Sequence, residues 1–118
     1  MDNKTLHKNI FKYWSHDELK ESVKCYLSIP HNKDDYNKII KKELYTHLRK
    51  KLNNRSQSSV EQRMSNISFV LKENNLNWNS NISPALSNVG KGVTKKILNI
   101  YRELNHIESD ISNLKPIK

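Results

Sequence analysis

The chain has 118 residues and is strongly basic, because 21 lysines and arginines against 12 acidic residues give a formal charge of +9. This length fits one domain. No run of 18 apolar residues and no signal-peptide-like segment is present, which argues against membrane-spanning and secreted proteins. We therefore expect a single cytoplasmic helical domain over residues 1–118, with a core over about 4–107 and a frayed tail at 108–118.

Charge and cysteine content narrow the partners and the compartment. Excess positive charge favours polyanions, namely nucleic acid, an anionic membrane face or an acidic protein. Cys25 is the only cysteine, so no intramolecular disulfide forms and a reducing compartment suits the chain. Because Cys25 lies among apolar residues at helical spacing, we expect it to be a small buried hydrophobic residue.

Helices are predicted along the chain, since glycine and proline are scarce and no alternating β-branched run appears. A short helix is expected over residues 4–13. A second begins after Ser15, where Glu18 completes a capping box three positions later. Pro30 ends it, because proline lacks the N–H that a helix interior needs.

Residues 31–35 read as a turn followed by an acidic first helical turn, and a third, continuous helix is predicted from there to about Lys50. Its apolar face carries Tyr36, Ile39, Ile40, Leu44 and Leu48, and its outer face carries Lys38, Lys41, Lys42, Arg49 and Lys50. This pattern is amphipathic. The lysines form either a plain solvated face or a surface that contacts phosphates.

The clearest apolar stripe predicts a helix over residues 58–74. The stripe consists of Val60, Met64, Ile67 and Leu71. Ser58 and Glu61 are expected to form its capping box, and Asn74 suits its C-terminus. The connection over 76–88 is expected to place its large side chains on the bundle.

A last helix, capped by Ser87 or Asn88, is predicted to turn five apolar residues to the core: Val93, Ile97, Leu98, Tyr101 and Leu104. The predicted elements define an all-α fold, a compact bundle of four or five helices.

The helix over 58–74 has a second face with varied polar side chains. At 100° per residue, Gln62, Arg63 and Asn66 fall away from the apolar stripe. Arginine, glutamine and asparagine are the side chains that read base edges by paired hydrogen bonds. Arg55 and Ser56 precede this helix, and backbone N–H groups at a helix N-terminus favour phosphate.

Structural roles for the same residues remain open. Ser59 and Glu61 suit a helix cap, Asn66 suits a brace to neighbouring backbone, and Arg55 suits an ion pair with an acid such as Glu61. Residues 88–92, with two glycines and Lys91, suit either a phosphate or simple helix capping. They do not have the spacing of a P-loop.

Three segments together resemble the N-terminal helical module of bacterial HNH-type restriction endonucleases and related restriction proteins. Residues 14–19 read WSHDEL, residues 55–71 read RSQSSVEQRMSNISFVL, and Pro84 is followed by an Asn-Val-Gly segment at 88–90. The resemblance spans about residues 14–104 and implies a DNA-facing module of a restriction system. It departs from the family at 81–84, where Asn-Ile-Ser-Pro replaces a Gly-Tyr-Lys-Pro-like approach, and no HNH signature follows within the 118 residues.

Catalytic and metal-binding patterns are absent from the sequence: the five histidines are dispersed, and no nucleophile elbow or HExxH motif occurs. We expect a double-stranded DNA-binding domain with no cofactor and no catalysis by this chain alone. The expected contacts are Arg55, Ser56, Ser59, Gln62, Arg63, Asn66, Lys38, Lys41, Lys42, Lys50 and Lys91. A nuclease domain or subunit is expected as a further partner of this DNA-binding domain. The alternatives are a module that docks an acidic protein of a restriction or anti-restriction system, and a nuclease active only after assembly.

Overall fold

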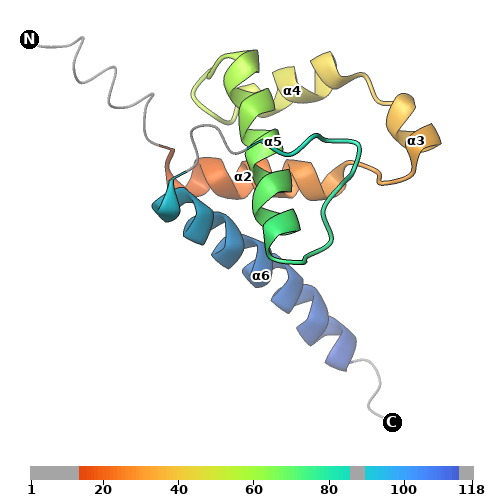
Figure 1. The fold of residues 1–118 in the computed structure, drawn as a ribbon, viewed down its shortest axis with the longest axis vertical. Helices are drawn as coiled ribbons and strands as arrows, with labels where there is room; N and C mark the ends of the chain where they lie inside the picture. Colours follow the sequence, from red (N-terminus) through yellow and green to blue (C-terminus); the bar gives the residue numbers. More distant parts are fainter. Residues whose placement is uncertain (1–13, 86–89, 115–118) are drawn as a thin grey trace, which may run out of the picture.

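The fold is all-α, as the sequence predicts. The computed structural model describes residues 14–85 and 90–114, with side chains through 105. Within these ranges the helices are α2 (His16–Ser28), α3 (Lys33–Asn37), α4 (Lys41–Arg49), α5 (Gln57–Glu73) and α6 (Lys91–Leu114) (Figure 1). The helix expected over 4–13 and the cap expected at Ser87 or Asn88 lie outside the described residues.

Helix α2 begins and ends where its sequence predicts. The Ser15 Oγ accepts a hydrogen bond from the Glu18 N–H at 3.1 Å, and the Ser15 N–H donates to the Glu18 Oε1 at 3.0 Å. These reciprocal bonds are the expected capping box, and they satisfy two backbone donors at the helix start. Ile29, before Pro30, is already extended.

The prediction of one continuous helix up to Lys50 is wrong, because the chain breaks it between α3 and α4. Asn37 and the consecutive β-branched Ile39 and Ile40 are weak helix formers, so an interruption there costs little. Ile40 is extended, caps α4 without a side-chain hydrogen bond, and is 59% exposed. Of the expected apolar face, Leu48 is buried, while Tyr36, Ile39 and Leu44 are half-buried against the core.

Helix α5 follows its predicted stripe but not its predicted cap. Val60, Met64, Ile67 and Leu71 are all buried, and Asn74 is the C-cap. The N-cap is Ser56, whose Oγ accepts from the Ser59 N–H at 3.1 Å. The capping box expected between Ser58 and Glu61 is therefore wrong, and Glu61 instead accepts from the Gln57 Nε2 at 3.1 Å.

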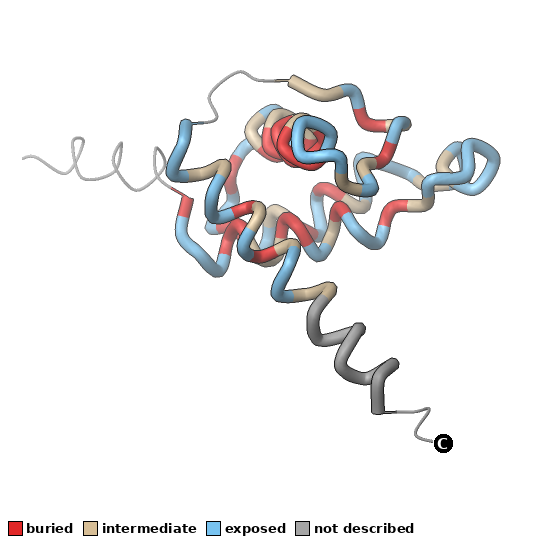
Figure 2. Tube along the Cα trace, turned by 60° about the horizontal axis from the view of Figure 1, so that its bottom comes forward, coloured by how far each residue is buried: buried red, intermediate tan, exposed pale blue. Residues whose placement is uncertain are grey.

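The core surrounds α5, which contacts α2, α4 and α6. Figure 2 shows the buried positions gathered where helices face one another, with exposed positions on their outer sides. On α6, Ile97 and Ile100 are buried. The other predicted core residues of α6, namely Val93, Leu98, Tyr101 and Leu104, are partly buried against the same core.

A polar network fixes the connection after α5 to the end of α2. The Asn79 N–H donates to the Tyr26 Oη at 2.7 Å, and the Tyr26 Oη lies 2.6 Å from the Ser68 Oγ. The Asn79 Nδ2 donates to the carbonyls of Ile29 and Pro30 at 3.0 and 3.1 Å. Because buried polar groups need partners, this satisfied network fixes the path of the connection.

Candidate nucleic-acid interface

Arg55 is buried in an ion pair, not exposed at a helix start. Only 4% of the residue is exposed. Its Nε donates to the Glu18 Oε2 at 2.7 Å and its Nη2 donates to the Glu18 Oε1 at 3.0 Å. The expected acid was Glu61, but the partner is Glu18, so one carboxylate both caps α2 and joins it to the segment before α5.

Arg63 is also buried, with 7% exposed, and it shares the Trp14 ring with Arg55. The guanidinium carbons of Arg55 and Arg63 lie 4.2 and 4.6 Å from the ring centroid. The Arg63 Nε is enclosed without a hydrogen-bond partner. Burial and then the charge of Arg55 lower the pKa of Arg63 to about 10, against the opposing effect of Glu18, so Arg63 stays charged at neutral pH.

Asn66 is fully buried and acts as the brace that the sequence left open. Its Oδ1 accepts from the Arg63 Nη1 at 3.2 Å, and its Nδ2 donates to the Ala85 carbonyl at 2.7 Å. The Asn66 amide therefore links Arg63 by hydrogen bonds to the segment between α5 and α6. Base reading would require this amide to leave its partners.

The expectation that Arg63 and Asn66 face away from the core is wrong, as is the exposure expected of Arg55. The reason is that α5 is contacted by α2, α4 and α6, so its buried arc is wider than one stripe. Of the other residues expected near this helix, Ser56 is exposed, and Ser59 and Gln62 are half-buried. The Ser56 Oγ donates to the Ser59 Oγ at 3.0 Å.

The lysines expected on the third helix are all exposed. Lys38 caps the C-terminus of α3, and Lys41, Lys42 and Lys50 lie on or directly after α4. We call these four residues the α4 basic face. In the described part of the chain its single ion pair joins Lys38 to Asp35 at 3.7 Å, between side chains that are 79% and 60% exposed. A pair so exposed to water holds Lys38 weakly.

The outward side of α4 is hollowed beside this face. Lys42 and Lys50 line an open depression of about 430 Å³ together with Glu43, Thr46 and His47. Tyr45 and Leu48, on the opposite side of the helix, are buried in the core. The helix is thus held by its apolar side and presents ammonium groups on the other.

Lys91 does not extend the α4 basic face. It is exposed at the first residue of α6, and α6 contacts α2 and α5 but not α4 among the described residues. Gly90 and Gly92 have open space around their Cα atoms. Asn88 and Val89 lie outside the described residues.

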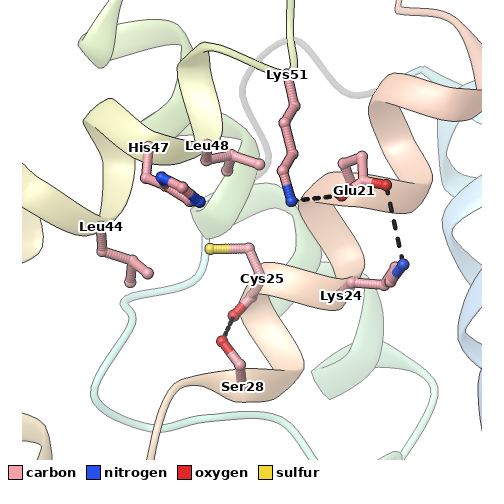
Figure 3. Close-up of a pocket in the computed structure, with 8 residues that line it drawn as sticks. All are labelled: Glu21, Lys24, Cys25, Ser28, Leu44, His47, Leu48 and Lys51. Atoms are coloured by element: carbon pink, nitrogen blue, oxygen red, sulfur yellow. Dashed lines mark hydrogen bonds and ion pairs between the residues drawn. The ribbon is translucent and has the colours of Figure 1, made fainter.

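A separate pocket of about 240 Å³ lies between α2 and α4 (Figure 3). Cys25 is half-buried there beside Leu44 and Leu48, so the expectation of a fully buried cysteine is only partly right. Burial raises the pKa of the Cys25 thiol to about 11, although nearby Lys51 opposes the shift. Lys51 pairs with Glu21 at 3.6 Å at the rim, so part of the positive charge here is already compensated.

Two other classes of site find no support in the described residues. No group of three or more His, Cys, Asp or Glu side chains there is arranged to hold a metal ion. None of the helices in the described ranges combines the length and apolar character needed to cross a bilayer.

The comparisons with known proteins place this chain in no established class. No protein-family model, curated protein or solved structure matches it. The motif residues Trp14, Glu18, Arg55, Arg63 and Asn66, on which the resemblance to restriction-enzyme modules rests, meet in one buried cluster. Their chemistry maintains the fold, and the exposed basic groups are elsewhere.

Proposed function

We propose that this chain binds double-stranded DNA through the α4 basic face, as a DNA-facing module of a restriction or defence-type protein. The observation that carries the proposal is the set of exposed, largely unneutralised lysines on a helix anchored by its apolar side. Lysines in this setting release counterions when they meet phosphates. The resemblance supplies the biological class, and cleavage would belong to an attached or associated nuclease.

The face favours phosphate contact over base reading. Lysine is a flexible point charge, and it lacks the planar fork with which arginine grips a guanine edge. Arg55 and Arg63 are unavailable, because both guanidiniums are buried. We therefore expect the α4 basic face to position the duplex with little dependence on base sequence.

Lys42→Ala and Lys50→Ala test the proposal. Each should weaken binding to a paired duplex and reduce the slope of log affinity against log salt by about one, because one phosphate contact is lost. Fluorescence anisotropy of a labelled duplex at four salt concentrations measures both quantities. Thermal melts should be unchanged, since both side chains are exposed.

Lys96→Ala is the matched control. Lys96 is exposed on α6, which does not contact α4 among the described residues, so the variant loses the same charge away from the α4 basic face. An equal loss of affinity in all three variants would show that total charge, and not this face, attracts DNA. Absence of duplex binding at low salt would reject the proposal and favour the acidic-protein partner.

A further inference from the structure

A polar pocket opens beside the α4 basic face, where α3, α4 and α5 meet the connection that follows α5. Its volume is about 250 Å³, and its lining includes Tyr36, Lys41, Tyr45, Glu61, Ser65 and Asn81. Drug-sized ligands occupy pockets of about 300 Å³ and more, so this one suits a smaller group such as a single heterocycle. Lys41 belongs to both the pocket and the α4 basic face.

Tyr45 gives this pocket an unused hydrogen-bonding group. The residue is 4% exposed, yet its hydroxyl has no hydrogen-bond partner among the described residues, whereas the Tyr26 hydroxyl has two. Among the described residues, the only side-chain nitrogen or oxygen that is both fully enclosed and without a hydrogen-bond partner is the Arg63 Nε, so the unpartnered Tyr45 hydroxyl is not fully enclosed. The Tyr45 hydroxyl therefore reaches open space, and the pocket is the described hollow that Tyr45 lines.

Two further walls of the pocket present acceptors. Glu61 uses its Oε2 to accept from the Gln57 Nε2, which leaves its other oxygen without a described partner. The Asn81 Nδ2 donates to the carbonyls of His31 and Pro30 at 2.9 and 3.3 Å. These bonds fix the Asn81 amide so that its Oδ1 remains an acceptor. An acceptor-rich pocket selects a ligand with N–H donors.

Tyr36 and Lys41 add groups that can bind the other parts of a nucleotide, namely the face of its base and its phosphate. The Tyr36 ring is half-buried at the pocket and offers an aromatic surface. The Lys41 Nζ lies 5.9 Å from that ring centroid, at a place where it can meet a phosphate. Aromatic stacking and hydrogen bonds to the Watson–Crick edge are the means by which proteins hold an extruded base.

We propose that this pocket binds one unpaired nucleobase that carries an exocyclic amino group, such as cytosine, in preference to thymine. The Glu61 carboxylate and the Asn81 Oδ1 accept from the amino group, and the Tyr45 hydroxyl bonds a ring nitrogen or carbonyl. The cytosine amino group has two N–H donors, one for each of these acceptors, whereas thymine has only its N3–H, so one of the two acceptors would be left without a partner. The inference rests on the proposed DNA binding, because the α4 basic face delivers the strand to the pocket.

The test compares three labelled duplexes that are fully paired, or contain one unpaired cytosine, or one unpaired thymine. We expect the unpaired cytosine to bind about tenfold tighter than the unpaired thymine. Tyr45→Phe and Glu61→Gln should reduce this ratio toward one. Tyr45→Phe should keep the affinity for the paired duplex and the melting temperature, because its hydroxyl bonds no described residue.

Glu73→Gln is the control for Glu61→Gln. Glu73 is exposed on the same helix, so the variant makes the same charge change without touching the pocket. It should keep the cytosine preference. Equal binding of both unpaired bases, with the paired duplex still bound through the α4 basic face, would overturn the pocket inference and leave the proposed function standing. Binding to none of the three duplexes would reject both.

Discussion

Two guanidiniums share one indole ring in the buried cluster of Trp14, Glu18, Arg55 and Arg63, and one of them, that of Arg55, is paired with the Glu18 carboxylate. The formal charge of these four side chains is +1, since two arginines face one glutamate. Stacking on an aromatic face offsets part of the cost of burying each cation. Glu18 nevertheless supplies the only negative charge among these four side chains, so the stability of the cluster depends on the ionisation of Glu18.

Glu18→Gln should destabilise the domain by about 3 to 5 kcal/mol, because it leaves buried cations without their counter-charge. Burial alone would raise the pKa of Glu18, but the hydrogen bonds from Arg55 and Ser15 and the charge of Arg55 lower it below 4.5. The stability from this pair is therefore complete above pH 4.5 and is lost as pH falls through the lowered pKa. Urea denaturation between pH 7 and 3 measures both effects, and the variant should lose less of its stability across the acid range.

Arg63→Met completes a double-mutant cycle with Glu18→Gln. Methionine keeps much of the arginine volume while removing a charge and an unpartnered Nε. The double variant should be more stable than Glu18→Gln alone, since one uncompensated cation is gone. Strictly additive losses would show that Glu18 and Arg63 are not coupled through this cluster.

At the level of elements, the sequence predicts what local patterns determine. The capping box of Ser15 and Glu18 and the stripe of α5 are local, and both are present. The break before α4 and the wide buried arc of α5 are not local, because they depend on how α2, α4 and α6 surround α5. Arg63 was misplaced for this reason: a helical period locates the most apolar side but cannot show that Trp14 covers the next one.

Ile40→Ser should stabilise the domain by about 1 kcal/mol, because Ile40 occupies an N-cap position without a side-chain acceptor. Little burial is lost, since Ile40 is 59% exposed. Ile39→Ser is the matched comparison and should destabilise the fold, because Ile39 packs against the core. Thermal unfolding of the two variants decides, and a lower melting temperature for Ile40→Ser would contradict the capping argument.

Across the whole molecule, part of the positive charge is inside and part is outside. Arg55 and Arg63 are buried, while the lysines of the α4 basic face are in water. Composition predicts an affinity for polyanions but does not say which cations remain available. The candidate pocket could not be predicted from the sequence, because Tyr45, Glu61 and Asn81 come from three separate segments that only the fold brings together.

The Cys25 thiol in the pocket between α2 and α4 can report how often these two helices separate. With the pKa of Cys25 raised to about 11, only about one thiol in a thousand is ionised at pH 8 in the closed state. When α4 separates from α2, the thiol returns toward its ordinary pKa and reacts faster. Because Cys25 is the only cysteine, the rate of alkylation by iodoacetamide should report these openings. The rate should rise in Glu18→Gln, because that variant destabilises the domain. The same rate in both proteins would mean that the thiol reacts without separation of the helices, whereas a faster rate in Glu18→Gln would show that it reacts from the open form.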